Sequence, residues 1–133
     1  RTRKKIETLT FNNNIRFLKP LSFSDYNKLQ INSKIVISDS GTISEESSIL
    51  NFPAINLREV HERPEAMEET SVILTGLNKE RVFQALNLLL SESDHKKMKL
   101  NIVGDYNVDN VSEKIVRIIL SYTDYVNNFI WKK

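Results

Sequence analysis

One stretch constrains the fold of this chain more than any other: an apolar strand, a short turn and a helix start follow one another. Lys34–Ser38 contains a run of β-branched residues bounded by polar ones, which is typical of an interior strand of a parallel sheet. Ser40 and Gly41 supply the turn. Thr42 then stands three residues before Glu45, which is the spacing of a capping box at a helix start. The sequence therefore predicts a strand–turn–helix unit here.

Such a unit can hold an anion. The amides of a first helical turn have no partners within the helix, and the helix dipole adds partial positive charge at that end. A phosphate could therefore be bound without a lysine. A capped turn with one glycine also occurs as an ordinary loop between a strand and a helix, so geometry alone leaves both interpretations open.

The rest of the chain up to Leu90 alternates between strand and helix patterns. This alternation predicts an α/β fold, part of a Rossmann-like parallel-sheet domain, with ligands at the carboxyl ends of the strands. The charged loop Arg58–Arg63 would then share an edge with the turn at Ser40. The predicted strands are residues 14–18, 34–38, 52–57 and 71–74, and the predicted helices begin near Ser24, Thr42, Pro64 and Asn78.

Two of these helices should have an apolar face. The first begins at Thr42 and carries Ile43, Ile49 and Leu50 at helical spacing. The second begins at Asn78, after Gly76 has ended the preceding strand. It carries its apolar residues on one side, namely Val82, Phe83, Leu86, Leu89 and Leu90.

The two ends of the chain have different patterns. Arg1–Lys5 is a basic run that predicts a short helix with a solvated basic face, and residues 91–110 are polar, typical of a solvated connector. Asn110 then begins a long helix whose apolar stripe favours packing on this domain over a free partner-binding helix. That stripe consists of Val111, Ile115, Ile118, Tyr122, Val126 and Phe129.

Composition excludes several classes of protein. The chain has 133 residues, 40% of them hydrophobic, with a net charge of +2, so one domain with a core is expected. It has no cysteine, which rules out disulfides and Cys-ligated zinc, and its two histidines cannot form a His-rich metal cluster. Its dispersed basic residues predict no nucleic-acid partner, and no run is apolar enough for a membrane span. We expect a cytoplasmic protein.

Two linked motifs resemble a known family. Residues 38–46 read Ser-Asp-Ser-Gly-Thr-Ile-Ser-Glu-Glu, and residues 61–67 contain Glu-Arg-Pro-Glu. Together they are similar to the C-terminal signature of the non-hydrolysing UDP-N-acetylglucosamine 2-epimerases, and the resemblance extends from Arg1 to about Leu90. It implies the C-terminal half of a two-domain GT-B-type architecture. Residues 1–109 would be part of the UDP-binding domain, and the helix in 110–133 would pack on it or across to a missing N-terminal domain.

The resemblance also implies a set of substrate-binding residues. Ser40, with the amides of Gly41 and Thr42, would bind the UDP pyrophosphate. Thr42 departs from the family's second glycine and could instead be only the helix N-cap. Glu46 would accept hydrogen bonds from the ribose hydroxyls, although it could be a solvent-facing glutamate. The remaining positions are Arg63 and, more weakly, Arg58 near the phosphates, and Leu21 and Tyr26 near uracil.

The activity implied by the resemblance is that of an isomerase that inverts C2 of a UDP-2-acetamido sugar by eliminating UDP and adding it back. Its acid and base groups would lie upstream of Arg1, so this chain alone should be inactive. The sequence opens without a methionine, and we expect a fragment of a longer protein. The resemblance implies no cofactor, a homodimer at full length, and a role in making cell-surface polysaccharide or capsule precursors.

Other functions stay open on the sequence. Within the family, the motifs look closest to the branch that makes UDP-N-acetyl-L-fucosamine from its L-talo epimer. A UDP-sugar glycosyltransferase would use the same fold and a similar turn. A non-catalytic UDP-sugar-binding or interaction module is the alternative from a different class.

Overall fold

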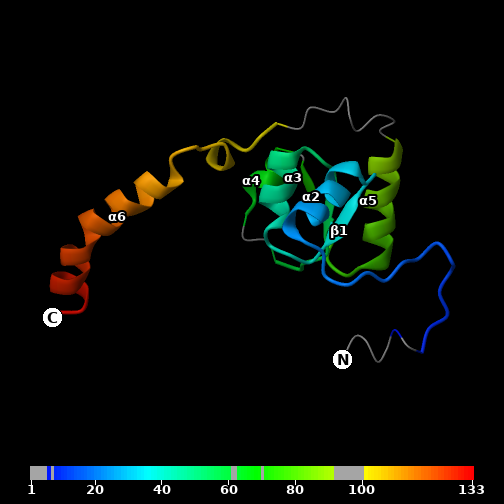
Figure 1. Ribbon diagram of the computed structural model, residues 1–133, viewed down its shortest axis with the longest axis horizontal. Helices are drawn as coiled ribbons and strands as arrows, with labels where there is room; N and C mark the ends of the chain where they lie inside the picture. The colour runs from blue at the N-terminus through cyan, green and yellow to red at the C-terminus, as the bar shows by residue number, and fades with distance from the viewer. Residues whose placement is uncertain (1–5, 7, 61–62, 70, 92–100) are drawn as a thin grey trace.

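The computed structural model describes residues 6, 8–60, 63–69, 71–91 and 101–133, and its centre is a three-stranded parallel sheet. The strands are β1 (Val36–Ser38), β2 (Ala54–Asn56) and β3 (Val72–Leu74), in that spatial order. Helices connect them, and α3 and α5 lie against the sheet (Figure 1). The predicted α/β parallel-sheet fold is confirmed.

The register of the sheet places the three carboxyl ends in one row. Ser38 is level with Asn56, and Asn56 is level with Leu74. The turn with Ser40 and Gly41 and the loop that begins at Leu57 therefore leave the sheet at the same edge. This is the edge at which parallel α/β sheets bind ligands.

β2, and not β1, is the central strand of the described sheet. All three residues of β2 are buried, whereas Ile37 of β1 is 46% exposed. The expectation of an interior strand at Lys34–Ser38 is wrong for the described sheet, because β1 pairs there only with β2. Strand residues of either position can be rich in β-branched side chains, so composition did not distinguish them.

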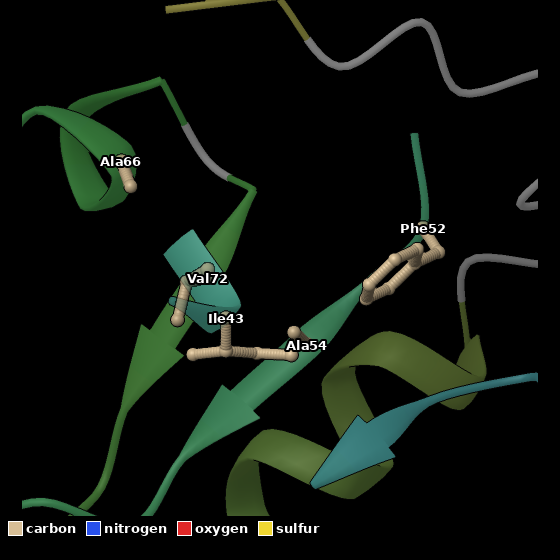
Figure 2. Close-up of a cluster of buried hydrophobic side chains, with 5 residues drawn as sticks. All are labelled: Ile43, Phe52, Ala54, Ala66 and Val72. Carbon is tan, nitrogen blue, oxygen red and sulfur yellow. The ribbon is translucent and has the colours of Figure 1, made fainter. Parts of the chain in front are cut away.

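One face of the sheet is covered by α3 (Ile43–Leu50) and α4 (Glu65–Glu68). Figure 2 shows Ile43 of α3 pointing toward Ala54 of β2 and Val72 of β3. Phe52 and Ala66 complete this buried cluster. Pro64 immediately precedes α4 as its N-cap, one residue from the predicted position.

The buried face of α3 is mostly serine. Ser44, Ser47 and Ser48 are fully buried with Ile43, whereas Ile49 is 52% exposed. The predicted apolar face is therefore only partly right. Small side chains allow the helix backbone to approach the sheet closely, and the Ser47 hydroxyl satisfies the Phe52 and Ser71 carbonyls at 2.6 and 2.9 Å.

The other face of the sheet is covered by α5 (Lys79–Ser91). Its Ala85 and Leu89 pack with Ile55 of β2. The predicted cap is confirmed, since Asn78 Oδ1 accepts from the Arg81 amide at 3.1 Å. Phe83 and Leu90 were expected on the buried side, but they are 53% and 51% exposed, because the contact with the sheet is narrower than the apolar stripe.

The segment before the sheet differs from the prediction. Residues 14–18 form no strand, and Phe17 and Leu18 are more than half exposed. No described strand lies alongside to supply ladder hydrogen bonds. The next helix, α2 (Phe23–Asn32), is capped by Ser22, whose hydroxyl accepts from the Asp25 amide, and not by Ser24. The predicted basic helix at 1–5 lies outside the described residues.

The predicted solvated connector returns to the sheet domain. Its residues 92–100 lie outside those described, but Val103 is 4% exposed and its amide donates to Ser48 Oγ at 3.0 Å. A 3₁₀ turn, η1 (Gly104–Tyr106), follows and contacts α3. Val103 and Tyr106 therefore contact the core from a stretch that was expected to be a solvated connector.

The long C-terminal helix is confirmed as α6 (Val111–Tyr125), continued by the π-helical turn η2 (Val126–Ile130). Every residue of α6 is exposed, and the helix extends away from the sheet (Figure 1). The expected packing of its apolar stripe on this domain is not present in the described residues.

Candidate functional site

The turn after β1 is held by a row of hydroxyl groups. The Ser40 amide donates to Ser38 Oγ at 3.0 Å, and the Thr42 amide donates to Ser40 Oγ at 3.3 Å. Ser40 Oγ lies 2.9 Å from Thr42 Oγ1. Since the Thr42 hydroxyl itself donates to Glu46, Ser40 is the donor in that pair. The turn is thus held by its own hydrogen bonds, with its polar atoms at the carboxyl edge of the sheet.

Two arginines converge on Gly41. A Cβ on Gly41 would lie 3.0 Å from Arg63 Nη1 and 3.2 Å from Arg58 Nη1. Glycine therefore matters at this position because it leaves room for two guanidinium groups beside the backbone of the turn. The structure brings together Ser40, Gly41, Arg58 and Arg63, which the sequence had placed on one edge.

The predicted capping box is wrong. Thr42 occupies the N-cap position of α3 with helical angles (φ −71°, ψ −9°), and its side chain makes no cap hydrogen bond. Its hydroxyl instead donates to Glu46 Oε1 at 2.8 Å. Glu45, the expected capping partner, forms an ion pair with Arg63, with Oε1 2.5 Å from Nε. The opposite charge of Arg63 is a stronger partner for a carboxylate than a backbone amide is.

Glu46 faces α2. Its Oε2 accepts from Gln30 Nε2 at 2.6 Å, while its Oε1 accepts from Thr42. Tyr26 of α2 is near enough that burial, and then the negative charge of Glu46, raise the pKa of its phenol. Leu21 lies just before α2 and is 42% exposed. Glu46 is therefore a fixed carboxylate and not a freely solvated one.

Two positioning residues were not singled out from the sequence. Asn56, at the end of β2, is 2% exposed; its Nδ2 donates to the Ser40 carbonyl at 3.4 Å, and its Oδ1 accepts from the Arg58 amide at 3.0 Å. A polar residue ending a buried strand beside the turn was the available signal. Gln30 is 3% exposed and holds Glu46, but nothing in the pattern of α2 indicated this.

A second group of polar side chains lies behind Arg63. The Tyr106 hydroxyl donates to Glu65 Oε1 at 2.7 Å. Burial and this bond raise the pKa of Tyr106, as do the charges of Glu65 and Glu45, while Arg63 lowers it. These four residues therefore form one electrostatic cluster next to the turn. His61 and Glu62 of the motif lie outside the described residues.

The fold and this edge define an α/β domain with an arginine-bearing, hydroxyl-rich turn at the carboxyl ends of its strands. The sequence pattern of the UDP-N-acetylglucosamine 2-epimerase family matches residues 1–120. The chain belongs to this family, and the resemblance inferred from its two motifs is confirmed.

Solved structures of this family superpose on the chain. The UDP-N-acetylglucosamine 2-epimerase of Rickettsia bellii is 49% identical and superposes with a TM-score of 0.86 over 99% of this chain and 37% of that one. The Methanocaldococcus jannaschii enzyme in complex with UDP-GlcNAc and UDP is 31% identical, with a TM-score of 0.70 over 90% of this chain and 30% of that one. The expected assignment to part of a two-domain GT-B-type architecture is confirmed.

The chain spans about a third of the length of the relatives it matches. The M. jannaschii UDP-N-acetylglucosamine 2-epimerase, for example, is 33% identical over 131 residues, which cover 94% of this chain and 34% of that protein. Within the described residues, no helix combines the length and apolarity needed to cross a membrane.

Proposed function

We propose that this chain is the nucleotide-binding portion of a UDP-N-acetylglucosamine 2-epimerase, and that its carboxyl edge holds the UDP of a UDP-2-acetamido sugar. The observation that carries the proposal is the convergence of Arg58 and Arg63 on Gly41, beside the amino end of α3. Two guanidinium groups and a helix N-terminus form an environment suited to a diphosphate. The complexes of relatives with UDP and UDP-GlcNAc support this choice of ligand.

The pyrophosphate would lie against the turn. Ser40 Oγ and the Thr42 amide now bond to each other at 3.3 Å, which is a long contact that a phosphate oxygen can replace. The two arginines would neutralise the charge that develops on UDP as it leaves, so they would act on the transition state as well as on binding. The Thr42 hydroxyl lies between Ser40 Oγ and Glu46, which holds it in place beside the turn.

Glu46 would bind the ribose. Each carboxylate oxygen can accept two hydrogen bonds, and each accepts one from the protein, so both can still accept from the 2′- and 3′-hydroxyls. Gln30 and Thr42 hold the carboxylate in place for this purpose. Tyr26 and Leu21, on and next to α2, would border the uracil.

The reaction would be inversion at C2 through anti-elimination of UDP and its re-addition. It needs groups that take and return the C2 proton. We place those groups in the part of the relatives that this chain does not span, and we expect the isolated chain not to turn over. The sugar nucleotide is proposed to be UDP-N-acetylglucosamine, with UDP-N-acetyl-L-fucosamine synthesis as the alternative within the family.

Three further features belong to the proposal. Residues 110–133 would pack across the remainder of the protein, because α6 has an exposed apolar stripe and the chain covers only a third of its relatives. The full-length enzyme would be a cytoplasmic homodimer. It would supply amino-sugar precursors for cell-surface polysaccharides.

Calorimetric titration with UDP tests the proposal. It compares the chain with Ser40→Ala, Glu46→Ala and Arg63→Ala, and uses Arg81→Ala on α5 as the charge-matched control. Losing a charged hydrogen bond should weaken binding about tenfold or more for Glu46→Ala and Arg63→Ala. Arg81→Ala should bind as the parent does. Glu46→Ala should bind UDP and its 2′-deoxy analogue with equal affinity, whereas the parent should bind UDP more tightly.

Activity requires the remainder of an enzyme. A chimera in which this chain replaces the matching third of the R. bellii protein should interconvert UDP-N-acetylglucosamine and its C2 epimer, whereas the chain alone should not. The proposal is wrong if neither the chain nor the chimera binds UDP, or if none of the three substitutions changes the affinity for UDP.

A further inference from the structure

We propose that Glu45 is a positioning residue that fixes Arg63 over the turn, so that the guanidinium is already in place when the diphosphate arrives. The inference rests on the proposed function and extends it to a residue outside the expected binding set. The carboxylate of Glu45, expected to cap α3, is turned instead to Arg63, with Oε1 2.5 Å from Nε.

The guanidinium of Arg63 has one nitrogen bound to Glu45 and another that faces the turn. Glu45 contacts Nε, whereas Nη1 of the same group lies 3.0 Å from the position that a Cβ on Gly41 would occupy. A guanidinium is planar and rigid, so fixing Nε fixes the direction of Nη1. Without Glu45, the long side chain of Arg63 would lose this restraint on its Nε, and UDP binding would have to supply more of the ordering.

Glu45 and Glu46 divide their roles because of helix geometry. Successive residues on a helix point about 100° apart. Glu46 is thereby turned toward Gln30 and α2, while Glu45 is turned toward the loop that carries Arg63. Two adjacent carboxylates thus contact two different segments next to the turn, α2 and the loop that carries Arg63.

The pair is buried enough to be coupled. The side chains of Arg63 and Glu45 are 33% and 30% exposed, and Glu45 Oε2 is buried with no hydrogen-bond partner among the described residues. The contact with Arg63 therefore supplies most of the compensation for burying this charge. Removing one partner of such a pair leaves the other uncompensated. Tyr106 and Glu65 bond to each other beside the pair, and the charge of Arg63 lowers the pKa of Tyr106.

The direction in which Glu45→Gln changes UDP affinity distinguishes a positioning role from a purely electrostatic one. A carboxylate next to a diphosphate repels it, so Glu45→Gln should strengthen UDP binding if Glu45 contributes charge alone. If Glu45 positions Arg63, the same substitution should weaken UDP binding in spite of the lost negative charge. The two outcomes differ in direction and not only in size.

UDP titration of the chain tests this directly. We expect Glu45→Gln to weaken UDP binding about fivefold and Glu45→Ala to weaken it more, because glutamine can still accept from Nε. Uridine, which lacks phosphates, should bind all three forms equally. In the Arg63→Ala background, Glu45→Gln should no longer weaken UDP binding and should strengthen it slightly, because the positioning contact is gone and only the repulsion between the carboxylate and the diphosphate is removed. Glu80→Gln on α5 is the control for lost charge.

A second measurement needs no ligand. The Arg63 Nε–H resonance should exchange slowly with solvent in the parent chain and in Glu80→Gln, and faster in Glu45→Ala. Unchanged exchange in Glu45→Ala, or tighter UDP binding by Glu45→Gln, would overturn the inference. If slow exchange depends on Glu45 but no form of the protein binds UDP, the proposed ligand is wrong while the positioning contact stands.

Discussion

The side-chain amide of Asn56 joins the end of β2 to the turn after β1, donating from Nδ2 to the Ser40 carbonyl at 3.4 Å. Its Oδ1 accepts from the Arg58 amide at 3.0 Å on the other side. One buried residue therefore sets the separation between the turn and the loop that carries an arginine. The geometry of the site depends on this bridge as much as on the residues expected to touch the ligand.

Asn56→Ala should lower the free energy of unfolding by about 1–3 kcal/mol, because it removes both hydrogen bonds of a buried side chain, to the Ser40 carbonyl and from the Arg58 amide. Urea unfolding measures the change. Asn110→Ala is the matched control, since that asparagine is exposed and makes no cap hydrogen bond. Equal stability of the two variants would show that the bridge is not stabilising.

Gly41→Ala should affect binding more than folding. The new Cβ would meet Arg63 Nη1 at 3.0 Å and Arg58 Nη1 at 3.2 Å, and both are the ends of flexible side chains that can move away. We expect a stability change within about 1 kcal/mol and UDP binding about tenfold weaker. At Gly104 a Cβ would meet nothing within 4 Å, so Gly104→Ala should bind UDP as the parent does.

Ser47→Ala should be strongly destabilising for so small a change. The hydroxyl is fully buried and donates to the carbonyls of Phe52 and Ser71. These two hydrogen bonds connect α3 to the residues that precede β2 and β3. Loss of the hydroxyl should lower the free energy of unfolding, measured in urea, by about 1–3 kcal/mol. Ser121→Ala is the control, because the Ser121 hydroxyl is on exposed α6 and bonds only within its own helix. A cost no larger than that of the control would contradict this role.

The domain should become less stable at high pH because the Tyr106 phenol loses its proton more easily in the unfolded chain. Burial and the bond to Glu65 raise its pKa above the ordinary value of 10.0, so the folded protein keeps the phenol proton at a pH where the unfolded chain loses it. The corresponding stability is fully present below pH 10.0 and is lost as pH rises above it.

Urea unfolding of the parent and of Tyr106→Phe across this range tests the prediction. The parent should lose more stability than Tyr106→Phe does, because phenylalanine has no proton to lose. Tyr122→Phe on α6 is the control and should follow the parent. A parent and Tyr106→Phe that lose stability in parallel would contradict the assignment.

Much of the fold could be predicted from local pattern. The β-branched runs at 34–38 and 71–74 and the Asn78 cap have short-range causes, so they were found within one or two residues. The strand at 14–18 was wrong because an alternating pattern forms a strand only beside a partner, and no described strand is there. The pattern of Ile49 and Phe83 was likewise helical, but burial depends on the width of the contact with the sheet.

The sequence by itself determined the alternation of strands and helices from residue 34 to residue 91, the family, and the turn at Ser40 and Gly41, because these follow from local propensity and from motifs that are contiguous in the chain. Only the tertiary structure decided which partner Glu45 takes, that Asn56 bridges two loops, and that Arg58 and Arg63 meet over Gly41. Each of these contacts joins segments separated in sequence, and a charged or polar side chain chooses among partners by distance and burial, which exist only once the sheet has brought the segments together.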